Sequence, residues 1–264
     1  MIDDFVVWIL TFNRPEALNR LIGNLNGCGF TNINVFNNYP FPLSPTLTEA
    51  NQERVNHVTT NYLNAPESNS WCARSWNSIY IKAFHEQQAK KLICIQDDCN
   101  VSSDFGKWLI DGSQKYDFIW GPAGDQFFYL TLDILKTVGF FDENFQGCYG
   151  QDSDMLRRVF HRYDKSKLSI CESHPFGGDH NPLSNFRSYV LTDLHVKAID
   201  SNYQNQHWEL EKQKTNYALF RSQNYFKSKW GIGIDEKSYK DYVPQLISEP
   251  IWYSWMMDKY NINV

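Results

Sequence analysis

The sequence predicts an α/β fold in which a mixed central sheet of about seven or eight strands lies between helices. Two apolar runs, at residues 5–11 and 92–95, have the composition of strands that are buried on both faces. Residues 15–25 place apolar side chains on one helical face, and a second strand follows at residues 31–36. A strand, a helix and a strand in succession imply a parallel pair joined by a crossover helix.

The remaining elements follow from the same patterns. We expect strands at residues 55–60, 117–120, 126–130 and 167–173. We expect one helix that ends near residue 89. We expect further helices over residues 105–113 and 132–138, in the segment after Gly150 and over most of 203–227. The aromatic tail at residues 251–257 either packs across the domain or forms an interaction surface. The chain is therefore interpreted as a core at residues 1–200 with a helical and aromatic extension at residues 201–264.

Composition and charge exclude several classes of protein. The chain has 264 residues and a net charge of −5, whereas a protein that tracks nucleic-acid phosphates is expected to be basic. No glycine-rich dinucleotide or phosphate-binding loop follows the first strand. The six cysteines have no metal-binding spacing and are interpreted as free thiols. The first apolar run is too short for a signal peptide or a transmembrane segment, so we expect a cytoplasmic protein.

Two adjacent acids, Asp97 and Asp98, follow the apolar run at residues 92–95. A strand that is buried on both faces and ends in charge puts these side chains at the carboxyl edge of the sheet, where α/β folds bind ligands. Neighbouring carboxylates repel each other, and a divalent cation relieves that repulsion. The alternative is a turn in which the aspartates bond to the backbone.

A second acidic pair, Asp152 and Asp154, begins an amphipathic helix. Such acids are either functional or cap the helix, since its dipole stabilises negative charge at this end. Further along, His174 and His180 lie in a glycine-bearing loop for which we find no packing purpose. The aromatic content of 16% suits either sugar stacking or an aromatic core.

Four segments together resemble nucleotide-sugar glycosyltransferases of the GT-A type. TFNRP at residues 11–15 resembles the opening of family 2 transferases, and QDD at 96–98 is similar to their acidic metal motif. GFFDE at 139–143 followed by GCYGQDSD at 147–154 resembles the G-F-x-x-x-F … W-G-G-E-D-x-D segment of β-1,4-galactosyltransferases. YFKSKWG at 225–231 resembles their Lys-Trp-Gly ending. The matches keep their order over roughly residues 5–231.

The resemblance implies a metal-dependent, inverting transfer of a sugar from a nucleoside diphosphate sugar, with UDP favoured, to a hydroxyl of a glycan or glycoprotein. It implies Asp152 as the general base. It also implies Mn²⁺ or Mg²⁺ held by Asp98, with Asp97 as a second ligand or ribose contact and His180, or else His174, completing the site. Residues 1–100 would form the nucleotide half of the core and residues 101–200 the acceptor half.

Further site residues are predicted on the same basis. The candidates for nucleotide binding are Thr11, Asn13, Arg14, Asn37, Asn38, Arg74 and Asp97, with Arg74 alternatively an ordinary surface arginine. The candidates for acceptor or sugar binding are Trp76, Trp120, Gln151 and Asp154; core packing is the alternative for the two tryptophans, and orienting the helix is the alternative for Asp154, with Arg158 as its ion-pair partner.

Two departures from the family pattern bear on this interpretation. Gln151 stands where the related enzymes carry a glutamate, and the acidic motif reads Gln-Asp-Asp-Cys in place of Asp-x-Asp. One alternative is therefore a non-catalytic carbohydrate-binding protein on a decayed transferase scaffold. Another is a sugar-1-phosphate nucleotidyltransferase, which is disfavoured because such enzymes need a glycine-rich basic loop after the first strand.

Overall fold

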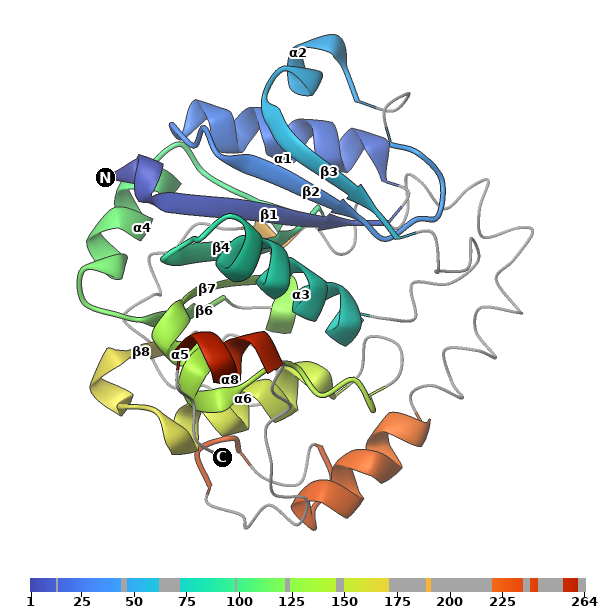
Figure 1. Cartoon of the computed structure of the whole chain (residues 1–264), viewed down its shortest axis with the longest axis vertical. Coiled ribbons are helices and arrows are strands. Elements are labelled where there is room, and N and C mark those ends of the chain that lie inside the picture. The colour runs from blue at the N-terminus through green and yellow to red at the C-terminus, as the bar shows by residue number, and fades with distance from the viewer. Residues whose placement is uncertain are drawn as a thin grey trace.

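The structure is a computed structural model that describes residues 1–12, 14–43, 47–61, 72–97, 99–121, 124–145, 150–170, 189–190, 220–234, 238–241 and 254–260. Within these ranges, seven strands form one sheet in the order β3-β2-β1-β4-β7-β6-β8 (Figure 1). Their bounds are β1 Phe5–Thr11, β2 Ile33–Asn37, β3 Val55–Thr60, β4 Lys91–Gln96, β6 Phe118–Trp120, β7 Phe127–Thr131 and β8 Leu168–Ile170. The predicted mixed α/β sheet between helices is confirmed.

The directions of the strands determine which strand ends lie at the same edge of the sheet. β1 pairs in parallel with β2 and β4, and β2 pairs in parallel with β3. β7 runs antiparallel to both β4 and β6, and β6 is parallel to β8. Of these seven strands, β7 alone is reversed. The loop that precedes β7 therefore lies at the same edge of the sheet as the carboxyl ends of the other six strands.

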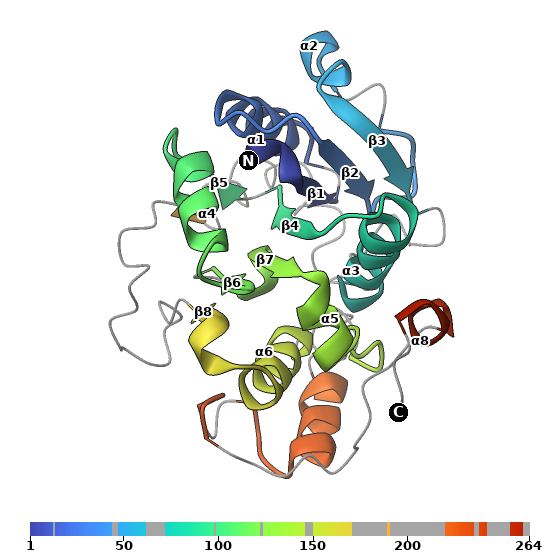
Figure 2. The same ribbon diagram turned by 60° about the vertical axis from the view of Figure 1, so that its left-hand side comes forward.

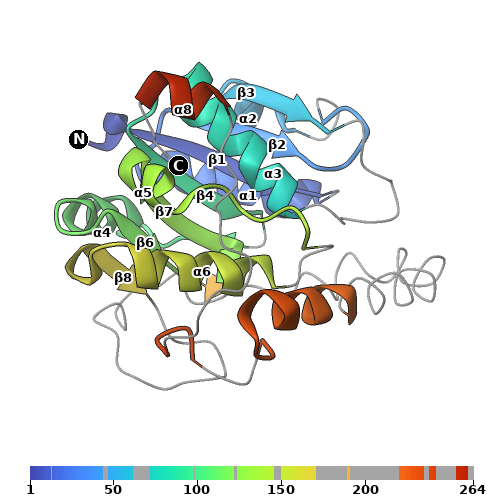
Figure 3. The ribbon, with the colours of Figure 1, turned by 60° about the horizontal axis from the view of Figure 1, so that its bottom comes forward.

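Helices cover both faces of the sheet. Figure 2 shows α1 (Pro15–Gly27) and α4 (Phe105–Ser113) on one side, and α3 (Cys72–Tyr80), α5 (Leu132–Val138) and α6 (Gln151–Arg162) on the other. A π-helical turn at Ile81–Glu86 continues α3, and a short helix, α2 (Glu49–Gln52), precedes β3. A helix over residues 220–230 lies beside α6 (Figure 3). The last described element is α8, Ser254–Tyr260.

The two central strands are buried on both faces, as their apolar runs predict. Along β4, Leu92 and Cys94 belong to the core that faces α3 and α5, whereas Ile93 and Ile95 belong to the core that faces α1 and α4. This alternation is the two-residue period of a strand. The side chains of β1 alternate in the same way, and Trp8 belongs to the core that faces α3 and α5, which is called the first core below. Both layers therefore depend on β1 and β4.

Several details differ from the sequence predictions. The stretch after β4 forms a separate short strand, β5 (Cys99–Asn100), which pairs with β9 (Tyr189–Val190). The predicted helix that runs to about residue 89 changes from α to π geometry after Tyr80. The aromatic tail contributes a helix whose Met256 is buried in the first core, which matches the packing alternative. The predicted helical segment at residues 203–219 lies outside the described residues.

Four of the six cysteines lie within the described residues. Cys28, Cys72, Cys94 and Cys99 are free thiols, and burial raises the pKa of Cys94 well above its ordinary value. Cys148 and Cys171 lie outside the described residues. In the part of the chain that the structure describes, no helix has the length and apolar character needed to cross a membrane.

Phe128 provides a test of the aromatic core. Its ring contacts Trp76 and Trp120 at centroid distances of 5.1 and 5.2 Å, and it has no exposed surface. Phe128→Ala is expected to lower the free energy of unfolding by about 3–5 kcal/mol, because the favourable transfer of the ring out of water is lost and a cavity is left in the core. Phe220→Ala, at a ring that is 63% exposed, is expected to change it by less than about 0.5 kcal/mol. Urea unfolding measures both, and similar losses in the two variants would contradict this account of the core.

Candidate functional site

The carboxyl ends of β1 and β4 meet at the point where the strand order reverses. From β1 the chain crosses to β2 and β3 on one side and later returns to β4 on the other, and ligands of open α/β sheets bind at such a point. Here Thr11 Oγ1 donates a hydrogen bond of 2.6 Å to Asp97 Oδ2. Arg14 Nη1 lies 3.3 Å from Asp97 Oδ1. Three predicted nucleotide-site residues are therefore brought together, and the buried Asp97 carboxylate ties the loop after β1 to the end of β4.

Asn37 and Asn38 form the adjoining part of this edge, after β2. Asn37 accepts a hydrogen bond from the Tyr39 backbone N–H at 3.1 Å and donates one to the Phe41 carbonyl at 2.7 Å. The Asn38 backbone N–H donates to the Thr11 carbonyl at 2.8 Å, and its side chain accepts from Asn61. Both asparagine side chains are buried and shape the edge of the sheet.

Three aromatic rings extend this edge toward solvent. Phe12, which follows β1, contacts Tyr39 at 5.4 Å, and Tyr39 contacts Phe41 at 5.2 Å. Phe12 and Tyr39 are half-buried, and Phe41 is 53% exposed. These rings were not among the site residues predicted from the sequence, although their position directly after two predicted strands was a usable signal. They offer flat apolar surface beside Thr11 and Asp97.

A second polar group centres on Asp125, in the loop before β7. Its Oδ2 accepts hydrogen bonds from Trp76 Nε1 at 2.9 Å and Gln151 Nε2 at 3.2 Å. Its Oδ1 accepts from Gln96 Nε2 at 3.2 Å. Asp125 therefore joins α3, the end of β4 and the first residue of α6. Asp125 was not among the residues predicted from the sequence; the available signal was an acid between two predicted strands at the ligand-binding edge.

Asp152 and Asp154 have different environments at the start of α6. The N-cap position is occupied by Gly150, which has a φ of +83°, and no side chain caps the helix. Asp152 is half-buried, and its Oδ1 accepts from the Ser153 backbone N–H at 2.8 Å. Asp154 is fully buried. Neither acid caps the helix, and of the two, only Asp152 keeps access to solvent.

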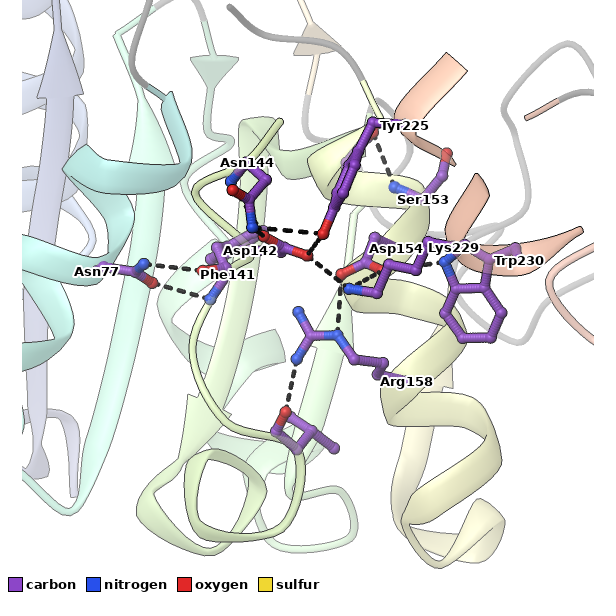
Figure 4. A network of polar contacts seen from close by, with 12 residues as sticks. Asn77, Phe141, Asp142, Asn144, Ser153, Asp154, Arg158, Tyr225, Lys229 and Trp230 are labelled. Atoms are coloured by element: carbon purple, nitrogen blue, oxygen red, sulfur yellow. Dashed lines mark hydrogen bonds and ion pairs between the residues drawn. The ribbon is translucent and has the colours of Figure 1, made fainter. Parts of the chain in front are cut away.

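Asp154 belongs to a buried ionic network, drawn in Figure 4. Arg158 Nε and Lys229 Nζ lie 2.9 and 2.8 Å from its two oxygens, and Trp230 Nε1 donates to it at 3.0 Å. The predicted pairing with Arg158 is confirmed. These contacts correspond to the helix-orienting alternative for Asp154, because its carboxylate is directed into the protein interior.

The same network includes Asp142, in the loop between α5 and α6. Lys229 Nζ lies 2.8 Å from Asp142 Oδ2, and Tyr225 donates its hydroxyl to that oxygen at 2.7 Å. Burial alone would raise the pKa of Asp142, but the charge and hydrogen bond of Lys229, with bonds from Asn144 and Tyr225, hold it below its ordinary value. Lys229 therefore fastens the helix over residues 220–230 to two other segments.

Arg74, on α3, forms an ion pair with Glu143 at 3.1 Å, and its side chain is 49% exposed. Asn77, one turn further along α3, exchanges two hydrogen bonds with the Phe141 backbone, at 2.8 and 2.9 Å. These contacts connect α3 to the loop that carries Asp142. They leave the guanidinium of Arg74 at the surface, where either of its predicted roles can be tested.

Trp76 and Trp120 lie in the core. The Trp120 ring stacks on Phe128, and Trp76 meets the same ring edge-on. Trp76 has no exposed surface and Trp120 has 3%. Both therefore match the core-packing alternative of the sequence analysis.

Four predicted site residues, Asn13, Asp98, His174 and His180, lie outside the described residues. Among the residues that are described, no group of three or more histidine, cysteine or acidic side chains is arranged to hold a metal ion. Of the predicted metal ligands, Asp97 alone is described. Its oxygens are the hard ligands that Mg²⁺ and Mn²⁺ prefer, and they are held by Thr11 and Arg14.

A scan against models of protein families and a search of curated proteins each found no match for this chain. What the chain does is therefore inferred from its own residues and their arrangement.

Lys229→Met tests the buried network. It leaves the carboxylates of Asp142 and Asp154 without a shared cation in the interior, so we expect a loss of about 3–5 kcal/mol in the free energy of unfolding. Lys227→Met is the matched control, since Lys227 lies on the same helix and is exposed. Chemical denaturation measures both variants. Equal stability of the two would show that Lys229 is not a structural cation.

The pH dependence of stability tests Asp142. Its pKa is lower in the folded chain than the ordinary value of 3.8, so its stabilising contribution is present above that pH and is lost as pH falls through the folded pKa. Asp142→Asn should therefore destabilise the protein strongly at pH 7 and progressively less as the pH falls below 3.8. Urea unfolding across this range measures the difference; Asp133→Asn, at a side chain 73% exposed, serves as control.

Proposed function

We propose that this chain is a metal-dependent glycosyltransferase of the GT-A type. It would transfer a sugar, with inversion, from a nucleoside diphosphate sugar, with UDP favoured, to a hydroxyl of a glycan acceptor. The observation that carries the proposal is the pair of hydrogen bonds from Gln96 and Gln151 to Asp125. They connect the end of β4, beside the proposed diphosphate site, with the start of α6, which carries the proposed base. Transfer requires the donor site and the base to face one reaction centre.

The donor side is supported by the residues at the ends of β1 and β2. Thr11, Arg14 and Asp97 form a polar group at the point where the strand order reverses, and Phe12, Tyr39 and Phe41 add partly exposed rings beside it. A nucleoside needs both features, since its base stacks on aromatic rings and its ribose and phosphates form hydrogen bonds. The edge is therefore suited to a nucleotide.

The proposed metal site consists of Asp98 with Asp97 and His180, and the oxygen and imidazole ligands favour Mn²⁺ over Mg²⁺. When bound, the cation supplies Lewis-acid stabilisation of the departing nucleoside diphosphate. Arg14 and Arg74 supply positive charge from the protein itself, and a guanidinium can pair with phosphate oxygens in a bidentate manner.

Asp152 is the proposed general base. Its carboxylate is half-buried and lies in the first turn of α6, whereas Asp154 is paired in the interior with Arg158 and Lys229. A base must reach the proton that it removes, which favours the accessible acid. Asp152 would accept the proton of the acceptor hydroxyl as the bond to the anomeric carbon forms and the bond to the diphosphate breaks.

The rival from another class is a non-catalytic carbohydrate-binding protein on the same scaffold, for which Gln151 is the indication. However, Gln151 donates a buried hydrogen bond to Asp125. This contact explains why a glutamine is present without requiring a loss of activity. The nucleotidyltransferase alternative is less well supported, because the sequence after the first strand, Phe12-Asn13-Arg14-Pro15, is not the glycine-rich basic loop of such enzymes.

Binding of the donor can be tested with a thermal-shift panel of nucleoside diphosphates and nucleotide sugars, each with Mn²⁺ and with EDTA. A ligand at about 100 times its Kd adds about 2.7 kcal/mol to stability and raises the melting temperature. We expect a Mn²⁺-dependent shift with one nucleotide sugar. No shift with any nucleotide, with or without metal, would falsify the transferase proposal.

Asp152→Asn tests the base. It should lower kcat by about 10²–10⁴-fold while leaving the affinity for the nucleotide sugar unchanged, because the amide cannot accept the proton. The matched control is Asp133→Asn, which changes an exposed first-turn acid of α5. Turnover by Asp152→Asn equal to that of the unaltered chain would exclude Asp152 as base, whereas a binding protein would show no turnover in either.

A further inference from the structure

Asp125 is a buried acid that the proposed mechanism does not use. It is 8% exposed, and it accepts hydrogen bonds from Trp76, Gln96 and Gln151, all of which are neutral donors. Through these bonds one carboxylate contacts α3, the end of β4 and the start of α6. A displacement of Asp125 would therefore also displace the end of β4 and the first turn of α6, which lie on the two sides of the candidate site.

Asp125 also determines how the amide of Gln151 is oriented. An ionised carboxylate only accepts hydrogen bonds, so the NH₂ group of Gln151 must face it, at 3.2 Å. The amide oxygen then points away from Asp125. That oxygen, Oε1, is buried and has no hydrogen-bond partner among the residues that the structure describes, and the Gln151 side chain has no exposed surface. Asp125 therefore holds the amide of Gln151 in one orientation inside the protein, and this contact fastens the first residue of α6.

We propose that Asp125 is a positioning residue of the transferase site. It holds Gln151, and with it the first turn of α6 that carries Asp152, against the end of β4, so that the proposed base keeps a fixed position relative to the proposed donor site. This inference rests on the proposed function. The ligand whose reaction depends on it is the hydroxylated acceptor, because Asp152 must reach the hydroxyl proton that it removes.

The same contact explains why this chain has Gln151 where the resembling motif has a glutamate. A glutamate would bring a second carboxylate to the position of an amide that now lies 3.2 Å from Asp125. Two carboxylates at that distance repel, and one must take up a proton or move away. A neutral glutamine at position 151 avoids this repulsion and can donate to the Asp125 carboxylate.

The test is a double-mutant cycle of Gln151→Glu and Asp125→Asn, with kcat and the acceptor KM measured at saturating nucleotide sugar. Gln151→Glu alone should lower kcat/KM by about 10²-fold, since displacement of the first turn of α6 misplaces Asp152. In the Asp125→Asn background the same change should cost at most about threefold, because the repulsion is gone. Asp125→Asn alone should lower kcat/KM by about tenfold through weaker orientation of Gln151.

Asp117→Asn is the matched control. Asp117 precedes β6 at the opposite edge of the sheet and accepts a hydrogen bond from Tyr163 at 3.0 Å, so the substitution has the same chemistry far from the site. It should lower the melting temperature while kcat and KM stay within about twofold. If Gln151→Glu is too unstable to assay, Gln151→Met replaces it; this variant loses the hydrogen bond to Asp125, so it should lower kcat by misplacing Asp152 and leave nucleotide affinity unchanged.

The outcomes separate this inference from the proposal on which it rests. Turnover by the unaltered chain, together with an effect of Gln151→Glu that is equal in both backgrounds, overturns the role of Asp125 alone. So does a loss of kcat/KM in Asp117→Asn equal to that in Asp125→Asn. Absence of turnover and of nucleotide binding in the unaltered chain overturns the transferase proposal and this inference together.

Discussion

Strand β4 is hydrogen-bonded to β1 on one edge and to β7 on the other, and its side chains fill the cores on both faces. A one-residue slip would exchange every side chain between the two cores, so the register is strongly specified. The position of Gln96 and Asp97 at the end of this strand is therefore determined by packing along its whole length. The hydrogen bond from Thr11 to Asp97 and that from Gln96 to Asp125 both start from this fixed point.

The segments that carry the family resemblance have an unexpected relation to one another. Asp142, Asp154, Lys229 and Trp230 come from two of the four motif segments and meet in one buried network (Figure 4). A buried charge is tolerated only when it is paired and hydrogen-bonded, and removing one partner is costly. These residues hold the helix over residues 220–230 and the start of α6 in a fixed relation. Part of what looks like a functional signature thus has a structural purpose.

The high aromatic content is divided between two environments. Trp76, Trp120 and Phe128 pack against one another in the core, where their large apolar surfaces contribute most of their stabilisation. Phe12, Tyr39 and Phe41 instead lie at the edge of the sheet, with Phe41 largely exposed. Composition predicted both uses of aromatic residues without assigning either to particular rings, because burial depends on which elements pack together.

The sequence by itself determined the elements whose pattern of apolar residues indicates which faces are buried. β1, α1, α4 and α5 lie where their apolar patterns predict, because a strand buried on both faces is continuously apolar and a helix that packs on a core repeats its apolar residues about every 3.6 positions. Helical spacing also placed Asp154 in line with Arg158, four residues along, and that ion pair formed. These are local relations between residues on one element, so the sequence contains them directly.

The tertiary structure alone decided which polar side chains meet. Thr11 and Asp97 are separated by 86 residues, Trp76 and Asp125 by 49, and Lys229 and Asp142 by 87. No period connects positions so far apart, and each acid could have faced solvent or the interior on its local pattern. Strand order, the reversed direction of β7 and the docking of residues 220–230 bring them together. The distinction between the buried Asp154 and the accessible Asp152 arises from these contacts, because burial of a charge depends on whether a distant partner reaches it.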